Sequence, residues 1–201
     1  MKKLSDIEKE NIAKKALKDD KFLGEMIDNL TENCDKRWPS FQVLNYISEK
    51  YPEALYSKWE YLTNLFRTGN SYTKYATIYI LANLTKVDTK NKFEKIFNDY
   101  FGEIDTNRTV TAAQVVFNSG KIAKAKPNLQ KKIIKKIMGI DNVHKGKQKE
   151  LIKGYAIDAF SEYYQDFKNK EKIIEYVRNQ LNSKSPSTQK RAKAFLNKWD
   201  K

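Results

Sequence analysis

The feature that most constrains this sequence is the spacing of its apolar residues, which recur at intervals of three and four along the whole chain. This spacing places apolar side chains on one face of an α-helix. No segment alternates polar and apolar residues as a half-buried strand does. The pattern therefore predicts an all-α protein made of amphipathic helices. One typical row is Leu55, Trp59, Leu62 and Phe66.

Glycines and prolines mark the expected helix ends. Three glycines follow apolar helical segments, where a left-handed residue without a Cβ can close the last turn. Every proline also lies at an expected helix boundary. This is consistent with helices, since proline is tolerated in the first turn of a helix but breaks a helix when it lies in the interior. These residues are Gly69, Gly102 and Gly139, and Pro39, Pro52, Pro127 and Pro186.

The expected helices form pairs at a nearly constant period. The first helices begin about 35, 35, 37 and 43 residues apart, and the longest interval contains an inserted loop at 141–148. Such a period is typical of solenoids, in which single pairs are too small to be stable alone. We expect one repeat domain over 1–201, with a capping helix within 1–19 and repeats over 20–201. The expected starts are Lys21, Tyr56, Asn91, Asn128 and Glu171.

The second helix of each pair carries a small residue, followed four residues later by a large apolar one. This combination allows helices to stack closely. The small residues are Ser40, Ala76, Ala113, Ala156 and Ala192, and the large residues are Leu44, Ile80, Phe117, Phe160 and Leu196.

Two segments, SPSTQKRAKAFL (185–196) and DTNRTVTAA (105–113), resemble the turn and second helix of HEAT repeats. The resemblance covers residues 20–200, and the first unit departs most because Trp38-Pro39 replaces the basic turn. It implies a right-handed α-solenoid of about five HEAT-like helix pairs plus an N-terminal capping helix. It also implies that second helices line a concave groove that holds a protein or peptide.

The formal net charge of +14 favours an acidic or polyanionic partner. Residues 121–153 contain eleven lysines and only Asp141 and Glu150 as acids. Two interpretations remain open: a phosphate-binding surface, or a solvated helix face in a lysine-rich, AT-rich coding background. Since only five cations are arginines, sequence-specific reading of bases is disfavoured. The lysines expected opposite the apolar face of their helix are Lys131, Lys132, Lys135 and Lys136.

Basic residues near the starts or faces of second helices, and on the inserted loop, are the candidate contacts to a partner or polyanion. In HEAT repeats, basic residues at such turns also link neighbouring repeats through acidic partners, which gives Arg108 and Arg191 a structural interpretation. The candidates are Lys74, Arg108, Lys121, Lys124, Lys145, Lys147, Lys153, Lys190 and Arg191.

Catalytic and metal chemistry lack their usual residues. His144 is the only histidine, so zinc clusters and His-centred triads are interpreted as lacking their parts. Cys34 is the only cysteine and is interpreted as a small buried or half-buried residue. No glycine-rich phosphate loop occurs. We expect no catalytic residue, metal or cofactor. The acidic row Asp158, Glu162 and Asp166 is interpreted as a solvated face with ordinary titration, and Trp38, Trp59 and Trp199 as core or cap residues.

The sequence thus predicts a non-catalytic scaffold that binds a protein segment. The alternative is a nucleic-acid-binding protein similar to HEAT-like DNA-alkylation glycosylases, which are also basic helical-repeat proteins; their catalytic aspartate and tryptophans match no positions in this chain. The first twenty residues contain no continuous apolar segment, and no stretch is long enough for a membrane span. We expect a cytoplasmic protein without membrane contact. The sequence indicates neither the partner nor the oligomeric state.

Overall fold

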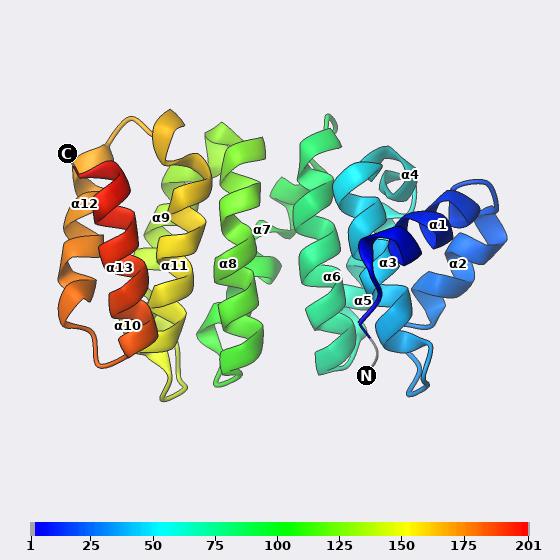
Figure 1. The fold of residues 1–201 in the computed structure, drawn as a ribbon, viewed down its shortest axis with the longest axis horizontal. Coiled ribbons are helices and arrows are strands. Elements are labelled where there is room, and N and C mark those ends of the chain that lie inside the picture. The colour runs from blue at the N-terminus through cyan, green and yellow to red at the C-terminus, as the bar shows by residue number, and fades with distance from the viewer. Residues whose placement is uncertain (1–2, 201) are drawn as a thin grey trace. The chain divides into compact units, whose positions relative to one another are not determined.

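The computed structural model describes residues 3–200, which form thirteen α-helices and five short 3₁₀ helices without any β-strand. The all-α prediction is confirmed. No helix within these residues is long and apolar enough to cross a membrane. The chain divides into two compact units, Met1–Ile96 and Phe97–Lys201, which meet within α7 in the sequence (Figure 1).

Unit 1 contains six complete helices, and each expected helix of this region is present. The expected capping helix is α1, and the two expected pairs are α2 with α3 and α5 with α6. A short helix, α4, fills the connection after Pro52. The bounds are α1 Asp6–Ala16, α2 Asp20–Asp28, α3 Arg37–Lys50, α4 Pro52–Tyr56, α5 Trp59–Thr68, α6 Ser71–Leu84, η1 Thr85–Val87 and α7 Lys92–Gly102.

The second helices of unit 1, α3 and α6, pack against each other, while α2 and α1 pack on α3 and α5 packs on α6. Contacts between α3 and α6 join residues about one period apart: the Nδ2 of Asn83 donates to the Oγ of Ser48 at 2.8 Å. Trp59 and Phe66 on α5 are each 1% exposed. The prediction that Trp59 belongs to the core is therefore confirmed.

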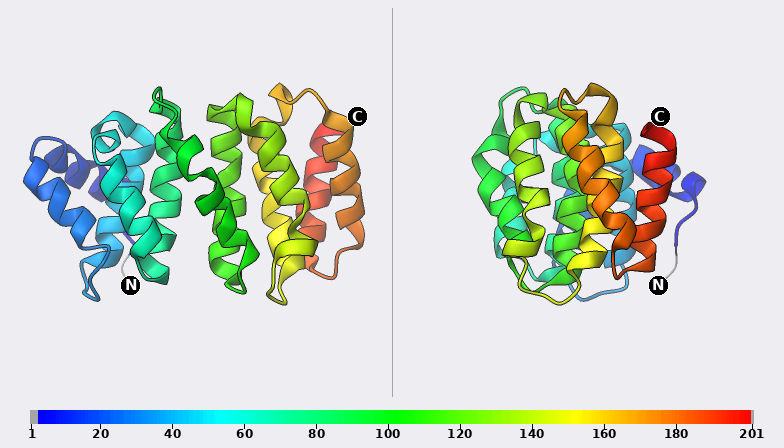
Figure 2. Two further views of the ribbon diagram at one scale, coloured as in Figure 1. Left: turned by 180° about the vertical axis from the view of Figure 1, so that it is seen from behind. Right: turned by 90° about the vertical axis from the view of Figure 1, so that its left-hand side faces the viewer.

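Unit 2 has two layers of helices. The second helices α8, α11 and α13 lie side by side, and α9 and α12 lie behind them in Figure 1 and in front in the left view of Figure 2. The bounds are η2 Glu103–Asp105, α8 Thr109–Ala125, η3 Pro127–Leu129, α9 Gln130–Met138, α10 Ile140–Val143, α11 Lys149–Tyr163, η4 Tyr164–Asp166, α12 Lys170–Asn179, η5 Gln180–Asn182 and α13 Pro186–Trp199.

Small residues allow the second helices of unit 2 to approach closely. A Cβ added to Gly120 of α8 would lie 2.6 Å from the carbonyl oxygen of Ala159 on α11. A Cβ on Gly154 of α11 would lie 2.6 Å from the Oγ1 of Thr188 on α13. Helix contact at these two points therefore requires residues without a side chain.

The aligned small residues of the second helices are all buried, as expected. Of the large apolar residues, Leu44, Ile80 and Phe160 are buried, but Phe117 and Leu196 are only half-buried. Val116 and Phe195, one position earlier, are buried instead. The predicted spacing of four residues between the small and the large apolar residue is therefore wrong for α8 and α13. In these two helices the large residue that faces inward lies three residues after the small one.

The helices end near the positions predicted from the sequence, but the backbone conformation at these ends does not always match the prediction. Ser5 and Glu8 form a capping box at the start of α1, and Asn70 caps α6. Gly69 and Gly139 follow α5 and α9, but both have negative φ, and no described glycine has a positive φ. The prediction that a glycine in the left-handed conformation ends these helices is therefore wrong.

The expected inserted loop is partly helical. Residues 140–143 form α10, and the remainder is fastened to the segment before α8. The Nδ1–H of His144 donates to the carbonyl oxygen of Ile104 at 2.9 Å, and the backbone N–H of Lys145 donates to that of Thr106 at 3.2 Å. His144 is 2% exposed, so the single histidine anchors this loop inside unit 2.

Candidate binding site

Five aromatic rings form a connected group on α3 and α6 of unit 1, here called the aromatic surface: Trp38, Phe41, Tyr72, Tyr75 and Tyr79. Neighbouring ring centroids lie 5.1–6.4 Å apart, and the Arg37 guanidinium lies 4.8 Å from the Tyr72 ring centroid. Such distances are typical of tilted and edge-to-face aromatic contacts and of cation–π contacts. The rings therefore hold one another in place.

Helical spacing explains why the tyrosines share a face. Tyr72, Tyr75 and Tyr79 follow one another at three and four residues on α6, so they lie on one side of the helix. The inward side carries Ala76 and Ile80, both 0% exposed. All three tyrosines and Trp38 are half-buried, whereas Phe41 beneath them is buried. The aromatic surface is thus a packed layer with its outer parts accessible to solvent.

The hydroxyl of Tyr72 is buried within the aromatic surface. Burial raises the pKa of its hydroxyl to about 12, although the nearby Arg37 charge opposes the shift. The hydroxyl oxygen is buried and makes no hydrogen bond to any described residue. The phenol therefore stays protonated at neutral pH and retains a hydrogen-bond donor that no described residue uses.

Two surface depressions are lined in part by Trp38. One, of about 740 Å³, is lined by Arg37, Trp38 and Tyr72 together with the loop residues Asn33, Cys34, Asp35 and Pro39. The other, of about 460 Å³, is lined by Trp38, Phe41, Gln42 and Asn45 of α3 and by Lys3 and Lys9. Concave sites lined by aromatic and polar side chains are typical of ligand contacts.

Cys34 differs from its prediction. It was expected to be buried or half-buried, but its side chain is exposed in the loop between α2 and α3. Loops run over the surface because buried backbone would leave polar groups unpaired. The cysteine therefore lies on the rim of the larger depression and not in the core.

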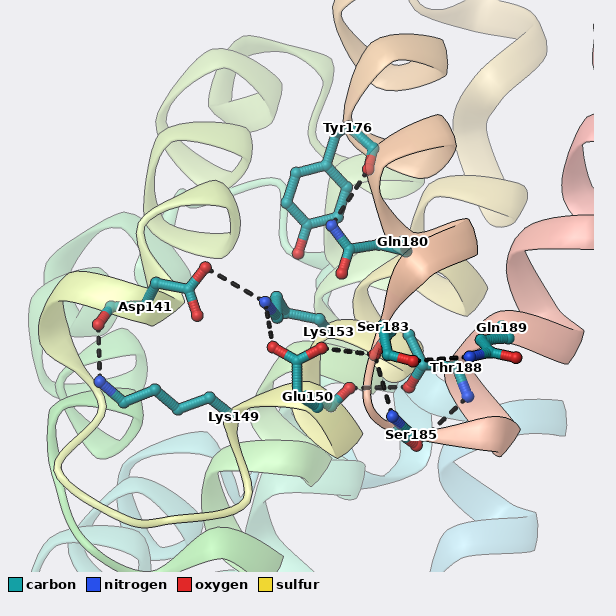
Figure 3. A network of polar contacts seen from close by, with 10 residues as sticks. All are labelled: Asp141, Lys149, Glu150, Lys153, Tyr176, Gln180, Ser183, Ser185, Thr188 and Gln189. Carbon is teal, nitrogen blue, oxygen red and sulfur yellow. Dashed lines mark hydrogen bonds and ion pairs between the residues drawn. The ribbon is translucent and has the colours of Figure 1, made fainter.

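A second group of polar side chains lies in unit 2, around Lys153 (Figure 3). The Nζ of Lys153 contacts the carboxylates of Asp141, at 3.2 Å, and of Glu150. The Ser183 hydroxyl donates to the Glu150 carboxylate, and the Thr188 hydroxyl donates to the Glu150 carbonyl oxygen at 2.7 Å. These contacts tie α10 and α11 to η5 and the start of α13.

The electrostatics of this group favour a structural role. Burial lowers the pKa of Lys153, but the hydrogen bonds from its ammonium to Glu150 and Asp141 outweigh burial and raise the pKa above the ordinary value. Lys153 is only 9% exposed and remains protonated. It is neither an amine nucleophile nor a cation open to a polyanion, in contrast to the open groove position expected for it.

Tyr176 lies next to the same group and is enclosed. Burial raises the pKa of its hydroxyl, and the Asp141 and Glu150 charges raise it further. The hydroxyl oxygen has no hydrogen-bond partner among the described residues. The phenol therefore stays protonated at neutral pH, beside two carboxylates that already bind Lys153.

The acidic row, which runs from α11 into η4, is only partly solvated. Glu162 and Asp166 are exposed as expected, but Asp158 is half-buried and accepts a hydrogen bond from the Nε of Arg191 on α13 at 2.8 Å. Burial raises the pKa of Asp158 although Arg191 opposes it. The expectation of ordinary titration is therefore wrong for Asp158. Arg191 links two helices through an acidic partner, which agrees with its structural interpretation.

The remaining candidate cations do not form one cluster. Arg108 lies 3.8 Å from the Glu103 carboxylate, near the exposed Lys145 and Lys147. Lys121 and Lys124 lie roughly 20 Å further along α8 at 1.5 Å per residue. Lys190 is exposed on α13, and the Nζ of Lys74 in unit 1 lies 5.3 Å from the Phe66 ring centroid.

The four lysines of α9 form the densest unpaired charge. Lys131, Lys132 and Lys135 are exposed and Lys136 is half-buried, while Ile133, Ile134 and Ile137 face inward. None of the four side chains makes a hydrogen bond or ion pair with any residue in 3–200. Their expected position on the solvent side of the helix is confirmed.

Within residues 3–200, no three His, Cys, Asp or Glu side chains come together as a metal site requires.

Trp199 at the end of α13 packs on Tyr164, with ring centroids 5.1 Å apart, as expected for a cap residue.

The sequence contained a signal for the aromatic surface that its interpretation missed. Tyr75 and Tyr79 lie off the inward stripe of α6, which carries Ala76 and Ile80. Tyrosine combines an apolar ring with a polar hydroxyl and is common where one end of a side chain stays wet. Tyrosines spaced at three and four residues on a second face therefore indicate a partly exposed layer.

Comparisons with protein-family models, with curated proteins and with solved structures found no match to this chain.

Proposed function

We propose that this protein is a non-catalytic binding scaffold, and that the aromatic surface of α3 and α6 holds a segment of a partner protein. The composition of the surface carries the proposal. Tyr, Trp and Arg are enriched where binding energy concentrates in protein–protein interfaces. Here a Trp, three Tyr and an Arg lie together, half-buried and fixed by ring contacts.

We further propose that the helix pairs form a HEAT-like α-solenoid whose second helices present the binding face. Contacts at about one repeat period support this: Arg37 with Tyr72 in unit 1, and Phe117 with Tyr155 in unit 2. The close helix approach at Gly120 and Gly154 supports it as well. The exposed single cysteine is compatible with the reducing cytoplasmic environment that we propose for this protein.

The charge around the aromatic surface favours a protein partner over a nucleic acid. Residues 1–96 contain 17 Lys and Arg against 14 Asp and Glu, a net charge of +3 out of +14. The larger depression is lined by both Asp35 and Arg37. A phosphate backbone is bound by several unpaired cations together, whereas mixed charge around aromatic anchors suits a polypeptide segment.

A displayed library of short random peptides, selected on the full-length chain, tests the proposal. We expect enriched peptides with apolar or aromatic anchors, and their affinity, measured by calorimetry, should fall about 30-fold or more in Trp38→Ala and Tyr75→Ala. Tyr61→Ala is the matched control, because Tyr61 is a 44% exposed tyrosine on α5, outside the aromatic surface.

Three results would count against the proposal. Selection could enrich no peptide, or the enriched peptides could bind Trp38→Ala and Tyr75→Ala as tightly as the wild type. Alternatively, oligothymidine could bind the wild type and lose affinity in the same two variants. That last result would reassign the rings to base stacking.

A further inference from the structure

The lysines of α9 form a surface distinct from the aromatic surface, because they belong to unit 2 and carry no aromatic ring. Residues 97–201 contain 22 Lys and Arg against 11 Asp and Glu, so +11 of the net charge of +14 belongs to this unit. Within it, the second helices bind several of their own cations: Lys153 and Arg191 are engaged by carboxylates. The four α9 lysines, by contrast, lie within six residues and their side chains have no such partner among residues 3–200.

The other first helices show that this lack of acidic partners is particular to α9. Glu60 lies on α5, Glu94 and Asp99 on α7, and Glu171 and Glu175 on α12, whereas α9 (QKKIIKKIM) has no acidic residue. A lysine-rich coding background alone would affect all these helices alike. On α9 the lysines also repel one another at four-residue spacing, and two of them lie in the first turn, where the helix dipole disfavours cations.

The density of this charge matches that of a nucleic-acid duplex. Lys131 to Lys136 span roughly 7.5 Å along the helix axis at 1.5 Å per residue. A duplex carries about one negative charge per 1.7 Å when both strands are counted, so roughly four phosphates, about two on each strand, occupy the same length. Lysine acts as a point charge and lacks the planar fork of arginine, which suits contacts to phosphates and not the reading of bases.

From this we infer that Lys131, Lys132, Lys135 and Lys136 form a binding surface for the phosphate backbone of duplex nucleic acid, without sequence specificity. Duplex binding by the α9 lysines does not require a protein segment on the aromatic surface. Loss of duplex binding and loss of peptide binding can therefore be observed independently.

Fluorescence anisotropy with a labelled duplex of mixed sequence, over a series of salt concentrations, tests the inference. Replacing the four α9 lysines by Gln should reduce the slope of log K against log salt by about 3.6, at about 0.9 per phosphate contact. The matched control replaces four exposed lysines elsewhere in unit 2, Lys168, Lys172, Lys184 and Lys193, and removes the same charge. It should change the slope much less.

The inference is overturned if the wild type shows no salt-dependent duplex binding, or if both four-lysine variants lower the slope equally. The second result would mean that only net charge matters. Vesicles containing phosphatidylserine provide the other arm: binding to them that depends on the α9 lysines, without duplex binding, would assign the surface to a membrane. Circular dichroism of each variant checks that the helices are retained.

Discussion

At the scale of single residues, glycines decide where helices can touch. A Cβ on Gly120 would meet two backbone atoms of Ala159, the carbonyl oxygen at 2.6 Å and the Cα at 2.8 Å. Backbone atoms cannot swing away as a side chain can, so α8 and α11 would have to separate. Gly24 in α2, by contrast, has no atom within 4 Å of an added Cβ. The same substitution should therefore have opposite effects at the two positions.

We expect Gly120→Ala to lower the free energy of unfolding by about 1–3 kcal/mol, because overpacking outweighs the gain in helix propensity. Urea denaturation followed by circular dichroism measures the change.

Gly24→Ala is the control and should raise the free energy of unfolding by about 0.5–1 kcal/mol, since alanine restricts the unfolded chain and meets no neighbour. Equal effects of the two substitutions would show that α8 and α11 do not approach as closely as described.

The carboxyl group of Glu150 makes the stability of the fold depend on pH. Burial would raise the pKa of its carboxyl, but hydrogen bonds from Lys153 and Ser183 outweigh burial and hold the pKa below 4.5. A carboxyl with a lowered folded-state pKa stabilises the fold above its unfolded pKa, and this stabilisation is lost as the pH falls through the folded value.

Glu150→Gln should therefore lower the free energy of unfolding by about 1–2 kcal/mol at neutral pH. The difference from the wild type should shrink as the pH falls below 4.5. Urea denaturation across this range measures it. Glu175→Gln, at an exposed position on α12, should change the free energy by less than about 0.5 kcal/mol. A difference for Glu150→Gln that grows toward low pH would contradict the described network.

Residue environments were predictable where a local pattern sets them and not where a distant partner does. The burial of Trp59 and Ala76 follows from helical periodicity. The environment of Asp158 depends on Arg191, 33 positions away on another helix. That of Lys153 depends in part on Asp141, which lies on the short helix α10, while Glu150 is its neighbour one turn earlier on α11.

At the scale of helices, the sequence predicted the order and the approximate starts. The first helices begin within three residues of the expected positions, because apolar periodicity and prolines act locally. The short helices α4 and α10 were not predicted, since four or five residues contain too little of a period to recognise. Capping side chains such as Asn70 and Ser185 fix the starts of α6 and α13.

The lysines of α9 destabilise their own helix, so replacing them should stabilise the fold even if it weakens binding. Two pairs of lysines at four-residue spacing repel each other, and the first-turn lysines oppose the helix dipole. Replacing Lys131, Lys132, Lys135 and Lys136 by Gln should raise the free energy of unfolding by about 0.5–1.5 kcal/mol at low salt. Urea denaturation is the measurement, because urea adds no ions.

Salt provides the control for this prediction. At about 1 M salt the screening length falls to roughly 3 Å, so the gain should largely disappear. The control variant with Lys168, Lys172, Lys184 and Lys193 replaced should show no comparable gain. A loss of stability on replacing the α9 lysines would mean that these side chains make stabilising contacts.

At the scale of the whole molecule, charge and aromatic residues are distributed unequally between the two units. The aromatic surface lies in unit 1 with its net charge of +3, and the unpaired α9 lysines lie in unit 2 with +11. The sequence predicted the positive charge and its concentration near 121–153. The sequence also suggested an acidic partner for Arg191, but it could not predict that Lys153 is engaged by Asp141 of the short helix α10. Nor could it predict that rings from α3 and α6 meet, because these residues lie more than 30 positions apart.

The most direct test of the proposed binding scaffold uses Cys34, the single cysteine, which is exposed and lines the same depression as Trp38 and Tyr72. The rate of alkylation of its thiol by iodoacetamide is measured with and without a peptide selected on the full-length chain. A saturating peptide should slow the reaction severalfold in the wild type and leave it unchanged, at the same concentration, in Trp38→Ala. An unchanged rate in the wild type at saturation would show that the segment binds elsewhere and would contradict the assignment of the aromatic surface.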